Sequence, residues 1–405
     1  MTVEKTNQPS STSSPKNTNT ALARVLLVDP SLFTAPYDTA LSVGLEAIGI
    51  ETQWAVRGLR RGEEDELGAS RSLPFFYPIT DGARRRAGGP WRALKGIEHG
   101  LGMRALLRLV RTMRFDLVHF QWLLVPAIDK RAMQQIRRFR PVVLTVHDTT
   151  PFNGKSVSRL QRDGFEAALA NADRLIVHTS QGREALLTLG LDPARIAIVP
   201  HGLLPRTKSD VVRQVAGRWR IVQFGKLQSY KGLDVLIEAI GLLDASDRAR
   251  ISVVVAGEAM MDVAPLLARA RELGITADSL DIRLGRLTTD DMDDLFADAD
   301  AFVFPYHAIE ASGVLFLVAS LGKWLIASDL GAFSELIGRD GDVGTLVAPG
   351  DPAALAAALR ASIGERPTRD LGASVPDWTS IARATRQVYL DAQAAWRTDR
   401  ASQAA

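Results

Sequence analysis

Two lysines lie close together in the second half of the chain. Gly225 and Lys226 follow Ile221 to Phe224, a predicted buried strand, and Lys231 comes five positions later. Gly225 allows the chain to leave the sheet in a tight turn, so both ammonium groups would point into the same cleft mouth. Two such cations beside a helix start suit a pyrophosphate group. A solvated turn with incidental lysines is the alternative.

A second polar turn lies about eighty residues further on, in the order Glu310, Ser312, Gly313, Val314. A helix start presents unpaired N–H groups that suit a phosphate, and glycine lets a ligand approach the backbone closely. A carboxylate at Glu310 would repel phosphate, but it could hold sugar hydroxyls beside one. In the alternative interpretation, Ser312 only caps the helix and Glu310 is solvated.

The elements around this second turn form a strand–helix–strand unit. The run Ala301 to Phe304 reads as a buried strand, which Pro305 ends because proline cannot donate to a ladder. Val314 to Leu321 is apolar on every side, as a helix buried between other elements would be. Trp324 to Ala327 is a second buried strand. Such a unit belongs to a parallel sheet.

Composition limits the class of protein. The chain has 405 residues, which suits two domains, and its 46% hydrophobic and 23% charged residues are ordinary for a soluble globular protein. It has no cysteine, which excludes disulfides, thiolate nucleophiles and thiolate metal sites. No apolar run approaches the roughly 20 residues of a membrane span. Residues 1–20 lack the apolar core of a secretion signal and are expected to be a disordered tail, so a cytoplasmic location is expected.

Short apolar strands alternate with helical stretches along the whole chain. Residues 21–205 hold one such series and 206–375 a second, which predicts two doubly wound α/β domains that face each other across a cleft. The segment Gly58 to Ala87, with Pro74 and Pro78, is charged and reads as irregular. Trp378 to Trp396 reads as a final helix, within a last segment at 376–405.

Several of these motifs resemble the group 1, family 4-like glycosyltransferases. The resemblance runs from Gln223 to Val347. It includes Gly225-Lys226-Leu227, which is followed after three residues by Lys231-Gly232. The first half matches more loosely, through Thr145-Val146-His147-Asp148 and Val199-Pro200-His201-Gly202. The resemblance implies the GT-B arrangement of two Rossmann-like domains, a nucleotide-sugar donor on the second domain, and a final helix that crosses back to the first. It implies no cofactor and no catalytic metal.

The donor-binding residues follow from this resemblance position by position. Lys226 stands where the family usually has an arginine, which keeps the charge but loses the bidentate fork. Lys231 matches the family's lysine, and both would hold the donor diphosphate. Glu310 lies near the position of the first glutamate of the family's paired-glutamate motif, and Ser312-Gly313-Val314 near that of its phosphate-binding turn, with a spacing about one residue shorter than the family's.

The chain also departs from the family's pattern. Val318 stands eight positions after Glu310, so the second glutamate, the usual ribose ligand, is absent. Ser31-Leu32-Phe33-Thr34 replaces the usual glycine pair after the first strand.

His147 and Asp148 are the candidate catalytic residues, because they end a predicted strand at the lip of the cleft. Imidazole can act as a general base near neutral pH, and Asp148 competes for that role. If the enzyme retains configuration, His147 would instead position the sugar. A histidine that only hydrogen-bonds a loop is the remaining alternative.

The sequence therefore predicts a glycosyltransferase that moves a sugar from a UDP- or GDP-linked donor to a saccharide or lipid-linked acceptor, in surface polysaccharide synthesis. The alternatives are a nucleotide-sugar epimerase or hydrolase on the same fold, and a degenerate binding or scaffold protein. Residues 84–140 hold 14 Lys and Arg against three acids. Part of this stretch, 84–114, could contact an anionic membrane at its inner face, or be an ordinary basic surface helix. No nucleic-acid-binding module accompanies the charge.

Overall fold

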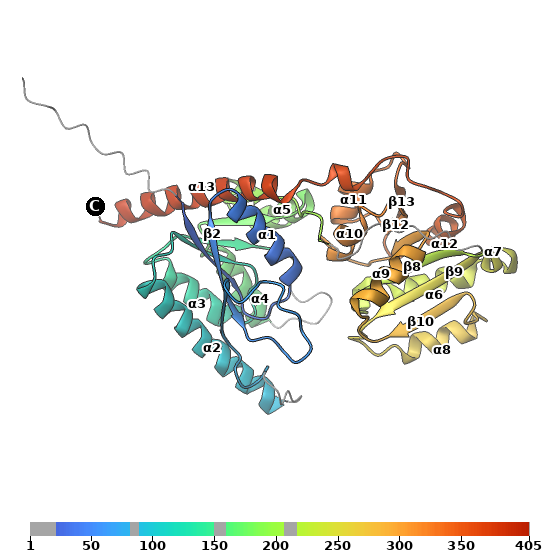
Figure 1. The fold of residues 1–405 in the computed structure, drawn as a ribbon, viewed down its shortest axis with the longest axis horizontal. Helices are drawn as coiled ribbons and strands as arrows, with labels where there is room; N and C mark the ends of the chain where they lie inside the picture. Colours follow the sequence, from blue (N-terminus) through green and yellow to red (C-terminus); the bar gives the residue numbers. More distant parts are fainter. Residues whose placement is uncertain (1–21, 82–88, 150–158, 206–216, 405) are drawn as a thin grey trace, which may run out of the picture.

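The computed structural model describes residues 22–81, 89–149, 159–205 and 217–404. It contains two parallel β-sheets in separate domains, with helices packed on the faces of each (Figure 1). The expected fold class, two Rossmann-like doubly wound domains, is therefore confirmed. The tail expected at 1–20, the arginines 84–86 and the segment 206–216 between the sheets lie outside the described residues.

The first domain is built on a seven-stranded sheet in the order β3-β2-β1-β4-β5-β6-β7. Its strands are β1 (Arg24–Asp29), β2 (Glu51–Arg57), β3 (Ser72–Phe76), β4 (Leu117–Phe120), β5 (Val142–Thr145), β6 (Arg174–Val177) and β7 (Ile196–Ile198). Its helices are α1 (Ala35–Ala47), α2 (Gly89–Thr112), α3 (Pro126–Ile136), α4 (Arg159–Leu169), α5 (Ser180–Thr188) and the 3-10 turn η1 (Pro193–Arg195).

The second domain is built on a six-stranded sheet in the order β10-β9-β8-β11-β12-β13. Its strands are β8 (Trp219–Phe224), β9 (Ile251–Gly257), β10 (Leu280–Leu284), β11 (Ala301–Phe304), β12 (Trp324–Ser328) and β13 (Gly344–Val347). Its helices are α6 (Leu233–Leu242), α7 (Ala245–Arg250), α8 (Ala264–Glu272), α9 (Thr289–Asp298), α10 (Gly313–Val318), α11 (Gly331–Ile337) and α12 (Pro352–Ala361), with the 3-10 turns η2 (Ser229–Lys231) and η3 (Gly372–Ser374).

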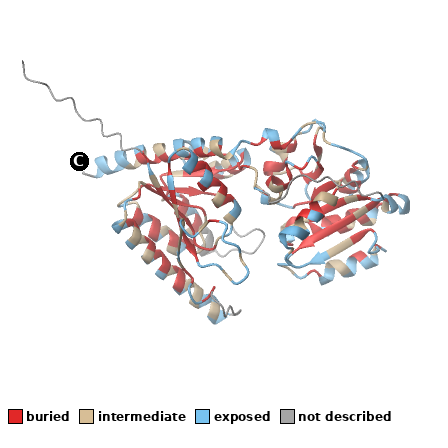
Figure 2. Cartoon of the chain, in the orientation of Figure 1, coloured by how far each residue is buried: buried red, intermediate tan, exposed pale blue. Residues whose placement is uncertain are grey.

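The apolar runs found in the sequence form the centres of these sheets. Every residue of β4, β5, β11 and β12 is buried, and Figure 2 shows the sheets as the buried centre of each domain. Because helices cover both faces of each parallel sheet, the side chains on both faces are apolar. This explains why these strands read as continuous apolar runs. The Thr288 hydroxyl caps α9 by accepting from the Asp291 N–H.

The interpretation of residues 58–87 as irregular is wrong for one part of that segment. β3 lies within it and pairs in parallel with β2 at the edge of the first sheet. An edge strand tolerates Pro74, because only one side of the strand needs ladder partners. The proline and the surrounding charges hid the strand from a pattern-based prediction. The short helix α7 was also missed.

The last helix, α13 (Trp378–Ala404), runs along the first domain, and the C-terminus lies at the far end of that domain (Figure 1). It packs closely on α1, where a Cβ added to Gly44 would lie 2.3 Å from the Trp378 carbonyl oxygen. Its Tyr389 hydroxyl lies 2.8 Å from Nδ1 of His119 in β4. Among the described helices, none is both long and apolar enough to cross a bilayer.

Candidate active site between the domains

The strand order of the second sheet places one crevice among the predicted donor residues. The chain adds β9 and β10 on one side of β8 and then returns to place β11 on the other side. In doubly wound sheets, ligands bind outside the carboxyl ends of the strands at such a reversal of order. The loop after β8 carries Gly225 and Lys226, and the loop after β11 carries Glu310 and Ser312. The topology therefore brings both predicted turns to one place.

Three of the predicted segments are in contact within this crevice. A Cβ added to Gly225 would lie 2.9 Å from Nζ of Lys231 and 3.2 Å from Cγ2 of Val314. Gly225 itself has φ +111°, a backbone conformation that favours glycine. Gly313 begins α10, and Ser312 occupies its N-cap position. The loop after β8, the buried lysine and the first turn of α10 thus surround a common point.

Lys231 is a buried cation, and the described part of the chain places no carboxylate in an ion pair with it. Only 8% of its surface is exposed, and burial lowers the pKa of its ammonium group. Its Nζ lies 5.4 Å from the ring centre of Tyr306, and no carboxylate forms an ion pair with it in the part of the chain that the structure describes. Taking an ammonium group out of water is costly unless an anion compensates it. Among the residues that the structure describes, the buried Lys231 ammonium thus has no compensating anion.

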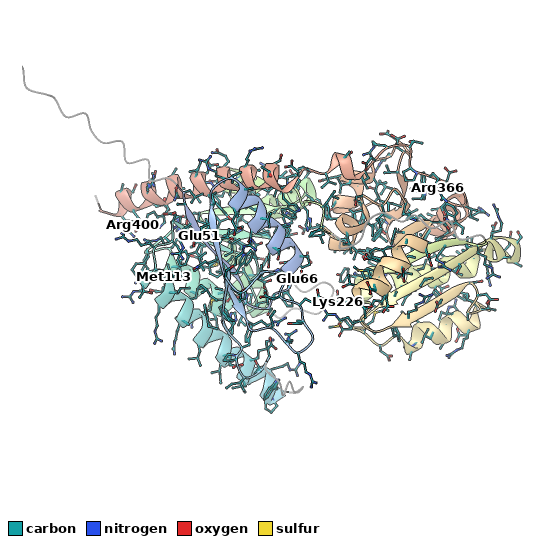
Figure 3. All side chains as sticks on the ribbon, in the orientation of Figure 1. Glu51, Glu66, Met113, Lys226, Arg366 and Arg400 are labelled. Carbon is teal, nitrogen blue, oxygen red and sulfur yellow. The ribbon has the colours of Figure 1, made fainter. Side chains whose placement is uncertain are left out.

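Lys226 differs from Lys231 in its surroundings. Its side chain is exposed, and Figure 3 shows it at the edge of the second domain that faces the first domain. Lys231 ends the turn η2 and is followed by Gly232 at φ +67°, a left-handed conformation that favours glycine. The two lysines that the sequence placed in one cleft mouth are therefore a buried cation and a peripheral one.

Glu310 is held by the first domain. One oxygen, Oε1, accepts hydrogen bonds from the backbone N–H of Thr149, at 2.5 Å, and from the Thr149 hydroxyl. Only 7% of the residue is exposed, and burial raises the pKa of its carboxyl against the opposing effect of the Thr149 hydrogen bonds. Its other oxygen would lie 2.7 Å from a Cβ added to Gly182. The carboxylate is thus fixed between the domains.

Two further hydrogen bonds join the domains on the same side of the crevice. The Gln181 side-chain oxygen accepts from the Gly331 N–H at 2.6 Å, and the Glu335 carboxylate accepts from the Ser180 N–H at 2.7 Å. With Thr149 and Glu310, they tie the loops after β5 and β6 to the loops after β11 and β12. The donor crevice is therefore bordered by groups of the first domain, which no sequence pattern had indicated.

His147 lies after β5 with both ring nitrogens occupied. Its Nε2 is 3.0 Å from Oε1 of Gln121, and its Nδ1 is 3.0 Å from Nε2 of His178. Burial holds the pKa of His147 well below its ordinary value, and the neighbouring histidines add to this effect. The ring is therefore neutral near pH 7.

The positions of the protons in this series of hydrogen bonds follow from its last member, the bond between His178 and the Val199 carbonyl. His178 Nδ1 faces the Val199 carbonyl at 2.9 Å, so it must carry the proton, and its Nε2 must accept from Nδ1–H of His147. His147 Nε2 is then an acceptor, which requires the Gln121 amide N–H₂ to face it. Exchanging the amide oxygen and nitrogen of Gln121 gives His147 Nε2 the N–H donor that it needs.

The charge of Asp148 acts on a residue of the second domain. Burial raises the pKa of the Tyr230 hydroxyl, and the nearby charge of Asp148 raises it further, against the opposing charge of Lys231. Asp148 is therefore near the η2 turn that carries Lys231. Val318, by contrast, is 1% exposed inside α10 and belongs to the core, so its position offers no ligand for a ribose. The described residues contain no cluster of three or more His, Asp or Glu that could hold a metal ion.

Comparisons with known proteins agree with this geometry. Residues 39–204 match the model of Glycosyltransferase Family 4, and residues 218–364 match that of Glycosyl transferases group 1. A D-inositol 3-phosphate glycosyltransferase of Geodermatophilus obscurus is 30% identical over 286 residues, which cover 64% of this chain and 62% of that relative. A glycogen synthase of Mycobacterium tuberculosis is 27% identical over 300 residues, 70% of each chain.

Among solved structures, Anabaena HepE in complex with UDP and glucose superposes with a TM-score of 0.68. The sequence identity is 17%, and the match covers 90% of this chain and 98% of that one. A likeness of this kind establishes the fold, which is GT-B.

Proposed function

The chain belongs to the group 1, family 4-like glycosyltransferases, and on this basis we propose that it moves a sugar from a UDP- or GDP-linked donor to a saccharide or lipid-linked saccharide acceptor. The observation that carries the proposal is the buried ammonium of Lys231, which has no ion-pair partner among the described residues. It lies at the strand-order reversal of the second domain, beside Gly225 and Val314. The pathway we propose is the synthesis of a surface polysaccharide.

The chemistry places its largest electrostatic demand on the leaving group. The bond between the anomeric carbon and the diphosphate oxygen breaks, and the acceptor oxygen forms the new bond to that carbon. Negative charge grows on the departing diphosphate, where Lys231 and the N–H groups of the Ser312-Gly313 turn would stabilise it. Lys226, at the rim, would attract the anionic donor. The two ammonium groups would thus supply the positive charge that a metal ion could otherwise supply. The rate of sugar transfer should therefore not change when EDTA is added.

His147 and Asp148 would divide the remaining roles. His147 is neutral, its pKa is low and its neighbours fix the ring, which favours hydrogen bonding to the sugar over proton abstraction. Asp148, near the Lys231 turn, is the stronger candidate to receive the acceptor proton. Glu310, already oriented by Thr149, would hold hydroxyls of the donor sugar.

The direct test is turnover of UDP-glucose, UDP-galactose and GDP-mannose by the purified full-length protein, with and without added oligosaccharides. We expect nucleoside diphosphate to be released at a rate that depends on the oligosaccharide, together with an elongated product. Free sugar or an epimer without acceptor would instead indicate a hydrolase or epimerase on the same fold. Donor binding without turnover, for every acceptor tried, would indicate a scaffold protein.

We also propose that α2 brings the protein to the cytoplasmic face of an anionic membrane. Ile97 and Leu101 are 62% and 55% exposed, one turn apart, and Arg104 and Arg108 continue the same exposed stripe. An apolar patch with flanking arginines is suited to the boundary between headgroups and acyl chains.

The membrane proposal predicts that the double variant Ile97→Ser/Leu101→Ser binds phosphatidylglycerol vesicles about tenfold or more weakly than the wild type. Sedimentation with the vesicles measures this. Leu242→Ser, which changes a leucine that is 62% exposed on the second domain, is the matched control and should bind like the wild type. Wild-type protein that stays in solution with these vesicles would show that α2 is only a solvated basic helix.

A further inference from the structure

The first sheet has its own reversal of strand order, between β1 and β4. The chain adds β2 and β3 on one side of β1 and then returns to place β4 on the other side. A crevice for a ligand is expected outside the carboxyl ends of β1 and β4, as it is between β8 and β11 in the second domain. The loop after β1 carries Phe33 and Thr34, and Trp122 follows β4. The residues at this position are therefore aromatic.

Phe33 is the exposed member of an ordered group of rings. It exposes 56% of its surface, and Trp122 lies perpendicular to it with ring centres 5.6 Å apart. The Trp122 indole N–H donates to the Thr34 hydroxyl at 3.1 Å, across the reversal point. His147 stacks on Trp122 at 4.8 Å with an interplanar angle of 15°. The rings lead from the exposed Phe33 to the predicted catalytic His147.

The loop that carries Phe33 is fixed by its own backbone hydrogen bonds. The fully buried Asp29 carboxylate accepts from the N–H groups of Ser31, Phe33 and Thr34, at 3.2, 2.7 and 3.3 Å. Leu32 takes the left-handed conformation, with φ +50°. An exposed aromatic ring on a rigid loop loses little conformational freedom when a ligand covers it. The Phe33 ring is therefore exposed by an ordered loop.

This crevice does not suit a phosphate. Arg57, a buried cation in contact with this loop, donates to the Ser31 carbonyl at 3.0 Å and pairs with the Glu63 carboxylate at 2.6 Å. Its charge is therefore already compensated, unlike that of Lys231 in the second domain. No glycine occurs between Asp29 and Thr34 to let a phosphate approach the backbone. An uncharged ligand with an apolar face fits these surroundings.

We infer that Phe33, braced by Trp122, is the stacking platform for the acceptor, on which one apolar face of a pyranose ring lies. The inference rests on the proposed transfer of a sugar, because that reaction needs an acceptor in the first domain opposite the donor crevice. A sugar ring presents C–H groups on one face and hydroxyls at its edge, so an aromatic surface binds the face while polar groups near His147 receive the edge. Phe33 is thereby a specificity-determining residue.

Saturation-transfer NMR tests this with three probes: methyl α-D-mannopyranoside, methyl β-D-glucopyranoside and methyl β-D-galactopyranoside. With wild-type protein and whichever of UDP or GDP it binds present, at least one probe should receive more saturation at the ring protons of one face than at the other. Phe33→Ser should weaken binding of that probe about tenfold and remove the preference for one face. Phe33→Tyr should retain both the affinity for the probe and the preference for one face. A purely structural role for Phe33 would not produce selectivity for one face of a sugar.

Leu189→Ser is the matched control, since Leu189 is also exposed, at 45%, but follows α5, away from the carboxyl ends of the strands. UDP binding by each variant, measured by calorimetry, separates this inference from the proposed function. If the wild type fails to bind both UDP and GDP, the proposed function has failed. If a nucleotide binds but no probe is saturated by the wild type, or Phe33→Ser behaves like Leu189→Ser, the platform is overturned.

Discussion

Replacing Lys231 with alanine is expected to lower kcat/KM for sugar transfer by about 100- to 1,000-fold, the loss seen when one preorganised group that stabilises transition-state charge is removed. The effect is large because the ammonium is buried beside Gly225, where its field is little screened. Steady-state release of nucleoside diphosphate measures the rate. Loss of a buried, unpaired cation should leave the fold intact or stabilise it, so a thermal unfolding curve separates the two effects.

The matched control is Lys226→Ala, which removes the same charge from an exposed position. Its effect should be about tenfold or less and should disappear at high salt, because exposed charges are screened. Lys231→Ala should remain defective at every salt concentration. Equal losses for the two variants would show that burial does not distinguish the lysines.

Acid is expected to destabilise the first domain through four buried histidines. Burial lowers the pKa of His119 and His201 to about 3, that of His178 to about 4, and that of His147 well below 6.5. Below pH 6.5 the unfolded chain binds a proton at each site while the folded chain does not, so stability is full above pH 6.5 and falls as the pH drops toward 4. Each histidine contributes up to about 1.4 kcal/mol per pH unit.

Two buried carboxyls affect stability with the opposite sign, because burial raises the pKa of Asp29 and of Asp38. The variant His119→Gln isolates one histidine, since the carboxyls contribute equally to both proteins. Urea unfolding from pH 4.5 to 8 should show that the slope of unfolding free energy against pH is smaller by about one proton in the variant, between pH 4.5 and 6. The difference in unfolding free energy between the two proteins at pH 8 gives the cost of lost packing alone. Parallel slopes throughout would show that His119 is protonated in the folded state.

The sequence was sufficient for the fold because its signals are local. Short apolar runs alternate with helical stretches, and this alternation predicts parallel sheets without any knowledge of contacts. The spacing of Gly225, Lys226 and Lys231 after one strand likewise brought these residues to one edge. β3 escaped because an edge strand with Pro74 lacks the apolar run that marks a central one.

The properties that decide the chemistry of the site depend on tertiary contacts, which local sequence patterns do not indicate. The pairing of Glu310 with Thr149 joins residues 161 positions apart, and nothing in either segment indicates it. The difference between the exposed Lys226 and the buried Lys231 depends on the packing around each side chain. The histidine cluster did leave a signal, because His119, His147, His178 and His201 lie in or just after four neighbouring strands, β4 to β7. Equivalent positions in adjacent parallel strands lie side by side.

The central claim is that Lys231 recognises the diphosphate of the donor. Calorimetric titration with UDP and UMP, and with GDP and GMP, measures how much the second phosphate adds to binding, in wild-type and Lys231→Ala protein. We predict that the diphosphate of one pair binds the wild type at least about tenfold more tightly than the monophosphate, and that this difference largely vanishes in the variant. A difference that survives the substitution unchanged would contradict the account, because the buried ammonium would then not be the group that holds the second phosphate.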